Sequence, residues 1–371
     1  LMLSRKLYNK GTEARYMNYK KIDGAGCIIC QSDEFYILKD VKKKNKKRLI
    51  PSFTANSITE RNNDGNMNEE PIDSEFTLGG EYEFDGNNFE FTLNPDFSQV
   101  EADQSKIDVN QTTALRFEER RIFFNEGKDF LSSDLAAVYT RSINDPEYAL
   151  KLYNRGEKHS YYFLDAEDNA TPIIVPGYQR SYSGLLGKSH ANIFSYNYNL
   201  ENGQNIGFLA TNRDYEDGGK NSLYSFRGKF LFNDIYSTKF ELVSTTMDEP
   251  ISDVINTSNV SKEHTYNLDG ESFDGYGGVF GLARDTENFY TRYYFATKSP
   301  NYRSDLGFTT ENDWTKHSLE QKFKYRSKGL IRSGNISLRK EIMTDYDDVV
   351  LDQETVISAR AELANQLNIN M

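Results

Sequence analysis

The chain has 371 residues, in which 44 Lys and Arg stand against 56 Asp and Glu, so the formal net charge is −12. A protein that binds duplex nucleic acid needs a basic face to displace counterions, so we expect no nucleic-acid partner. Only 37% of the residues are hydrophobic, and no apolar run of about 18 residues could cross a bilayer as a helix. Tyr (25) and Phe (24) dominate the apolar residues and favour pleated strands, so the sequence predicts an all-β protein.

Residues 1–47 are interpreted as an N-terminal linker region. They begin without the charged, apolar and small-residue order of a secretory signal, so a signal has been removed or, as we favour, the sequence is a fragment. Cys27 and Cys30 form a CxxC motif, which can be redox-active or half of a zinc site. Because no second pair follows and the four His are scattered, we favour a disulfide or two inert thiols, and expect no metal and no cofactor.

From Arg48 onward the chain consists of segments of roughly 8 to 14 residues in which apolar and polar side chains alternate. In one of them, Tyr224 and Phe226 alternate with Ser225 and Arg227. The same alternation occurs between Gly, Asn and Asp turns in the segments 76–84, 89–94, 194–200 and 236–242. Each segment predicts a strand with one aromatic face and one polar face.

Two architectures produce such strands. In a soluble sandwich the aromatic faces would meet in a core, whereas in an outer-membrane barrel they would face lipid and the polar faces would line a lumen. Short turns are predicted at 85–88, 201–203, 233–235, 285–288 and 327–329, and longer connections at 59–74, 215–221, 247–271, 298–313 and 344–353. Because this alternation is typical of membrane barrels, residues 48–371 are predicted to form an antiparallel transmembrane β-barrel. The pattern still alternates in 356–371, so we expect only an incomplete portion of it.

The charged stretch between residues 94 and 131 interrupts this rhythm. Mixed charge of this density rarely faces lipid, so we expect residues 99–131 to form a luminal, plug-like segment. The candidates for a ligand-binding site or a luminal ion-pair network are Asp96, Glu101, Asp103, Arg116, Glu119, Arg121 and Glu126. In a barrel, short turns lie at one rim and long connections at the other. Because the turns near 145 and 156 are both short, this order is expected to be broken once. A crossing of the lumen between residues 99 and 134 would take the chain from one rim to the other.

Two sequence blocks carry a family resemblance. Residues 94–103 read Asn-Pro-Asp-Phe-Ser-Gln-Val-Glu-Ala-Asp, and residues 116–127 read Arg-Phe-Glu-Glu-Arg-Arg-Ile-Phe-Phe-Asn-Glu-Gly. Both blocks resemble a widespread family of bacterial outer-membrane barrel proteins, whose pattern at the second block is close to FFPEKRPFFLEG. The matching positions are Phe117, Glu119, Arg121, Phe123, Phe124, Glu126 and Gly127. Residues 207–213 and 304–308 resemble further landmarks of the family.

The resemblance implies a location in the bacterial outer membrane, a family-9-like carbohydrate-binding module ahead of the barrel, and no established catalytic residues. We therefore expect a non-enzymatic barrel that anchors such a module, or binds or transports a ligand, with outer-membrane lipid and a carbohydrate as partners. Members of the family are often labelled membrane-associated hydrolases, so a surface-exposed glycoside hydrolase with two carboxylates from the charged segment is an alternative. A second alternative is a subunit of a larger envelope complex, with envelope proteins as partners.

Overall fold

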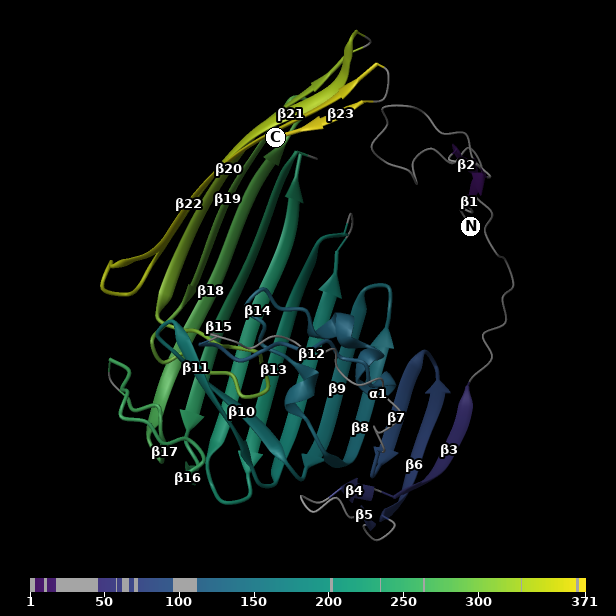
Figure 1. Cartoon of the computed structure of the whole chain (residues 1–371), viewed down its shortest axis with the longest axis vertical. Coiled ribbons are helices and arrows are strands. Elements are labelled where there is room, and N and C mark those ends of the chain that lie inside the picture. Colours follow the sequence, from purple (N-terminus) through teal and green to yellow (C-terminus); the bar gives the residue numbers. More distant parts are fainter. Residues whose placement is uncertain are drawn as a thin grey trace.

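The computed structural model describes residues 4–9, 12–17, 46–57, 59–61, 67–69, 73–95, 112–200, 203–233, 235–262, 264–327, 329–364 and 367–371. Its main element is one antiparallel sheet of 15 strands (Figure 1). In order across the sheet these are β3 (Lys47–Asn56), β6 (Asp73–Phe84), β7 (Asn87–Leu93), β8 (Pro146–Arg155), β9 (His159–Asp168), β12 (Ser189–Asn199), β13 (Asn205–Tyr215), β14 (Lys220–Phe232), β15 (Tyr236–Asp248), β18 (Ser272–Asp285), β19 (Phe289–Lys298), β20 (Trp314–Arg326), β21 (Ile331–Thr344), β22 (Val350–Leu363) and β23 (Asn368–Asn370).

The remaining described elements are small. The two-stranded hairpins are β1 (Ser4–Asn9) with β2 (Thr12–Met17), β4 (Thr59–Arg61) with β5 (Met67–Glu69), β10 (Thr171–Gly177) with β11 (Arg180–Leu186), and β16 (Ile251–Ser252) with β17 (Leu268–Asp269). Short helical turns occur at α1 (Ile122–Asn125), η2 (Lys128–Leu131) and η3 (Thr140–Ser142). Within the described ranges, no helix is long and apolar enough to span a membrane.

The prediction of an all-β, antiparallel fold is confirmed. The sheet has two edges, β3 and β23, and does not close on itself into a barrel. The structure therefore confirms one large antiparallel sheet, but it does not show the closure that the predicted barrel requires.

The predicted alternation of short turns and long connections is confirmed only in part, because two of the predicted long connections, 216–219 and 345–349, are as short as the turns. At the β6–β7 turn, Asp85 and Gly86 have φ values of 47° and 81°, which is the left-handed geometry of a tight hairpin. The longer connections carry the small hairpins, and Figure 1 shows β4–β5, β10–β11 and β16–β17 together at the lower end of the sheet.

The connection between β7 and β8 corrects one prediction. Leu93 pairs with Tyr148, and the amide of Asn94 donates to the oxygen of Glu147 at 2.8 Å. The chain therefore leaves the sheet after β7 and returns beside its point of departure. Because β7 and β8 are antiparallel neighbours, the connection between them begins and ends at the same rim of the sheet. The prediction that the order of connections is broken once, and that the chain changes rims between 99 and 134, is therefore wrong.

One face of the sheet, here called the outer face, exposes the aromatic and aliphatic stripe of its strands. Among its large side chains, Phe208 is 36% exposed, Leu242 60% and Ile357 73%. Rings on neighbouring strands lie beside one another, as in Phe226 and Phe240, whose ring centroids are 5.7 Å apart. The two-sheet sandwich with these rings in its core is therefore wrong for the described structure.

The opposite, inner face is covered by residues 112–145, here called the covering segment (Figure 1). Phe124, Phe130 and Leu135 of this segment are buried in one hydrophobic cluster with inner-face residues such as Leu164 and Leu223. Gly127 immediately precedes η2 and has a φ of 81°, and a Cβ atom there would lie 2.9 Å from the Tyr162 ring, so this turn requires glycine.

Candidate functional site: the covering segment and its polar cavity

Glu119 and Arg121 form a buried ion pair within the covering segment. Arg121 donates from Nη2 to Glu119 Oε2 at 2.7 Å and from Nε to Oε1 at 2.9 Å, and the two side chains are only 7% and 6% exposed. Arg121 also donates to the backbone oxygens of Ile143 (2.7 Å) and Thr140 (2.9 Å). The Thr140 hydroxyl donates to Glu119 Oε2 at 2.7 Å, so the pair fastens the start of the segment to its end.

Burial by itself raises the pKa of Glu119, but the hydrogen bond and the charge of Arg121 outweigh it, so the pKa lies below its usual range. A general acid needs the opposite shift, toward the operating pH. Glu119 is therefore held in its ionised form.

Of the other predicted site residues, only Arg116 and Glu126 belong to the part of the chain that the structure describes. Asp96, Glu101 and Asp103 lie outside the described residues, as do Cys27 and Cys30. Arg116 is exposed, and its guanidinium carbon lies 5.7 Å from the ring centroids of both Tyr139 and Phe308.

Glu126 is exposed and supplies its backbone oxygen to a second anchor of the segment. Lys151, on β8, is fully buried and pairs with Glu90 of β7 at 2.7 Å. The same ammonium group donates to the backbone oxygens of Phe123 (2.5 Å) and Glu126 (3.1 Å). Lys151 thus ties α1 and the turn that follows it to the sheet.

A third anchor holds the end of the covering segment. Asp168, at the end of β9, accepts the backbone N–H groups of Asn144 (3.0 Å) and Asp145 (2.7 Å). Arg213 of β13 is fully buried and donates to the backbone oxygen of Ser142 at 3.0 Å. Arg213 is the last residue of the block 207–213, which carries part of the family resemblance, but its role in holding the covering segment was not predicted.

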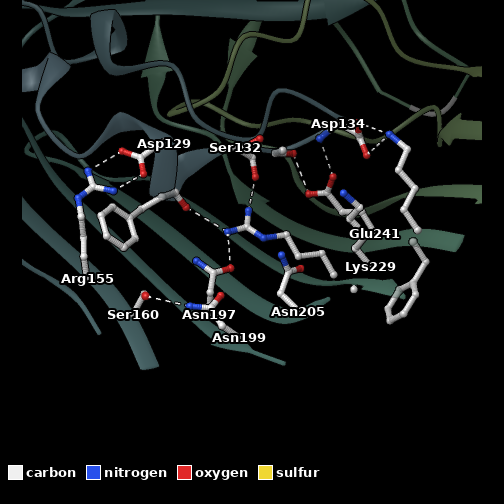
Figure 2. A pocket seen from close by; sticks show the side chains of 16 residues that line it. Asp129, Ser132, Asp134, Arg155, Ser160, Asn197, Asn199, Asn205, Lys229 and Glu241 are labelled. Atoms are coloured by element: carbon white, nitrogen blue, oxygen red, sulfur yellow. Dashed lines mark hydrogen bonds and ion pairs between the residues drawn. The ribbon is translucent and has the colours of Figure 1, made fainter. Parts of the chain in front are cut away.

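A polar cavity of about 450 Å³ lies between residues 129–134 of the segment and the inner face of strands β8 to β15 (Figure 2). Arg227 donates to the backbone oxygens of Phe130 (3.0 Å) and Ser132 and to Asn197 Oδ1 (3.2 Å). Glu241 accepts from the Ser133 hydroxyl (2.7 Å) and the Asp134 amide (2.8 Å). These two strand residues thereby hold residues 130–134 of the covering segment in place.

Two ion pairs flank the cavity, Arg155 with Asp129 and Lys239 with Asp134, the latter at 2.7 Å (Figure 2). Amide side chains from two neighbouring strands lie between these pairs: Asn197, Asn199 and Asn205. No other described residue hydrogen-bonds the side chains of Asn205 and Lys229, so their donors and acceptors remain for a ligand or solvent.

A second cavity, of about 760 Å³, lies on the other side of the covering segment. It is lined by the segment itself, by the β10–β11 hairpin and by residues 304–308. The covering segment therefore separates a polar cavity near the short turns from a more mixed one near the long connections.

The polar floor of the first cavity could be predicted only in part. Strand alternation puts Arg227, Lys239 and Glu241 on the polar face, because each follows or precedes an outward aromatic residue. Nothing in that alternation distinguishes the buried Glu241 from the exposed Lys229.

Comparison with known families matches residues 68–159 to a domain of unknown function, DUF5916. The match runs from β5 to the first residue of β9, so it includes β6, β7, the covering segment and β8. Both blocks that carry the family resemblance fall within it. The class that emerges is an open antiparallel β-sheet with a covered inner face, and residues 68–159 of it form a DUF5916 domain. No curated protein sequence matches the chain.

Proposed function

We propose that the chain is the wall of a non-enzymatic outer-membrane β-barrel protein, with the outer face in lipid and the covering segment in the lumen. The observation that carries this proposal is the distribution of side chains on the two faces. Rings and aliphatic groups are exposed on the outer face, whereas buried ion pairs and hydroxyls lie beneath the covering segment. A contiguous exposed apolar face of this kind favours lipid over water.

The strand lengths support this placement. Strands β14, β15 and β20 have 13 residues each and β21 and β22 have 14, whereas a tilted strand needs about 9 to 11 residues to cross the hydrocarbon core. The open edges at β3 and β23 set a further condition. Every backbone group in lipid needs a partner, so a barrel requires strands other than these fifteen to join the two edges.

We further propose a carbohydrate as the ligand of the polar cavity. Asp129 and Asp134 are paired with Arg155 and Lys239, and Arg227 and Glu241 are hydrogen-bonded to the covering segment, which leaves the Asn205 amide and the Lys229 ammonium as the main contacts. Sugars present hydroxyls that both donate and accept, and Asn side chains offer both functions in one group. Binding of a neutral ligand of this kind would be consistent with a role in anchoring or transport.

The hydrolase alternative gains no support from Glu119. Glycoside hydrolysis needs one carboxylic acid with a raised pKa, and Arg121 holds Glu119 in its ionised form. A role as a subunit of an envelope complex stays a prediction that no described contact tests.

Membrane fractionation tests the central proposal. We expect the chain to sediment with membranes of a Gram-negative host, to resist extraction at high pH, and to enter solution only with detergent. Recovery in the soluble fraction without detergent would contradict the lipid-facing role of the outer face.

Calorimetric titration with a panel of neutral oligosaccharides tests the ligand. Asn205→Ala should weaken binding about fivefold, since one net hydrogen bond contributes about 1 kcal/mol. Asn335→Ala, which removes an amide on the distant strand β21, is the matched control. Absence of binding by the unaltered chain, or equal binding by Asn205→Ala, would count against a carbohydrate in this cavity.

A further inference from the structure

Three carboxylates converge where the β15–β18 pair ends, at the side of the long connections. The ladder ends at the pair Asp248 and Ser272, and the amide of Glu249 donates to the backbone oxygen of Glu271 at 2.9 Å. Asp269 belongs to the adjacent β16–β17 hairpin. One carboxylate oxygen from each of Glu249, Asp269 and Glu271 lies within 4.8 Å of the other two.

Each of these carboxylates has one oxygen engaged by the protein. Arg303 Nη1 donates to Glu249 Oε1 at 2.6 Å. Thr265 donates from its hydroxyl to Asp269 Oδ2 and from its amide to Glu271 Oε2, both at 2.8 Å. Among the described residues, the second oxygen of each carboxylate accepts no hydrogen bond.

The second oxygen of Glu249 is the independent sign of a ligand. The residue is only 5% exposed, and its Oε2 is buried without any hydrogen-bond partner in the described structure. A buried carboxylate oxygen without a partner is strongly destabilising, because it has lost its hydration and gained nothing in return. A cation held between Glu249 and the two more exposed carboxylates would satisfy it.

The surrounding charge points the same way. Arg303 is shared between Glu249 and Asp305, to which its Nε donates at 2.9 Å, so one guanidinium faces two buried carboxylates. Asp269 and Glu271 add two further negative charges, and the described basic group that faces them is His264, whose Nδ1 lies 3.7 Å from Glu271 Oε2.

We propose that Glu249, Asp269 and Glu271 bind a calcium ion. Hard divalent cations prefer oxygen ligands, and water supplies the remaining positions. Ca²⁺ takes oxygen ligands at about 2.3–2.6 Å in flexible geometry, whereas Mg²⁺ demands near-ideal octahedral geometry at about 2.1 Å, so three carboxylates from separate strands and a hairpin suit Ca²⁺ better. The ion would join the β16–β17 hairpin to β15 and, through Arg303, to residues 303–305. It does not depend on the location of the chain in a membrane.

Calorimetric titration of the full chain with CaCl₂, after removal of metal with a chelator, tests the site. The chain is kept in buffer or detergent, whichever maintains it in solution, and MgCl₂ is titrated in parallel. We expect one saturable Ca²⁺ site with a Kd of about 10⁻⁴ to 10⁻³ M, the range of calcium sites in extracellular modules, and weaker Mg²⁺ binding.

Asp269→Asn and Glu271→Gln should each weaken Ca²⁺ binding at least about tenfold, since each removes one of three charged ligands. Asp253→Asn, which neutralises an exposed carboxylate in the same connection, should leave binding unchanged. Circular dichroism of each variant without calcium checks that its strands are retained. Absence of saturable binding by the unaltered chain, equal binding by both ligand variants, or a preference for Mg²⁺ would overturn the assignment.

Discussion

Removal of Arg121 is the sharpest test of how the covering segment is held. In Arg121→Ala, the carboxylate of Glu119 keeps its charge at 6% exposure but loses the cation that compensates it. The backbone oxygens of Thr140 and Ile143 lose a donor as well. Removing one partner of a buried ion pair destabilises a protein by about 3–5 kcal/mol, and we expect a loss of that size in the free energy of unfolding.

Denaturant unfolding of the full chain, followed by the fluorescence of Trp314, measures this loss. Trp314 is the single tryptophan and packs against the main hydrophobic cluster, so its emission reports on the packing beneath the covering segment. The matched control is Arg339→Ala, which breaks a pair with Glu354 at the same Nη2–Oε2 distance of 2.7 Å but at 42% and 49% exposure. An exposed pair contributes about 0–1 kcal/mol, so the control should change stability little.

A double variant separates the buried charge from the lost packing. Glu119→Gln neutralises the carboxylate, so Arg121→Ala combined with Glu119→Gln should be less destabilised than the sum of the two single variants. A loss below about 1 kcal/mol in Arg121→Ala, or strict additivity in the double variant, would refute the role assigned to this pair.

Three further predictions follow from the same structure. The pKa of Glu119 is lower in the folded than in the unfolded protein, so its contribution to stability is complete above the unfolded pKa of about 4.3 and is lost as the pH falls through the folded value. Acid unfolding curves of Glu119→Gln should therefore be flatter in this pH range than those of the unaltered chain. Leu242→Arg places a charge on the outer face and should destabilise the chain by about 2–4 kcal/mol in a bilayer, and an unchanged denaturation midpoint would count against a lipid environment. Gly127→Ala should lower thermal stability more than Gly203→Ala, because both glycines have positive φ but only the first has a ring, that of Tyr162, within 2.9 Å of the new Cβ; equal melting temperatures would contradict this.

The strands, the turns and the polarity of each face could be predicted from the sequence alone. Alternation is a local property: once Phe226 points outward, Arg227 must point to the opposite face. The same holds for the β6–β7 turn, where Asp85 and Gly86 tolerate the left-handed backbone that a tight hairpin needs. The blocks with a family resemblance also marked Glu119 and Arg121 before their contact was visible.

Only the tertiary structure decided which polar groups are buried and which of them meet. Arg213 and Lys229 both belong to polar stripes, but the covering segment lies over the first and leaves the second exposed. The return of the chain to its own rim after residue 94 depends on the pairing of β7 with β8, and the approach of Glu249 to Asp269 depends on strands that meet across a twenty-residue connection. Such contacts join residues far apart in the chain, so no local pattern of side chains encodes them.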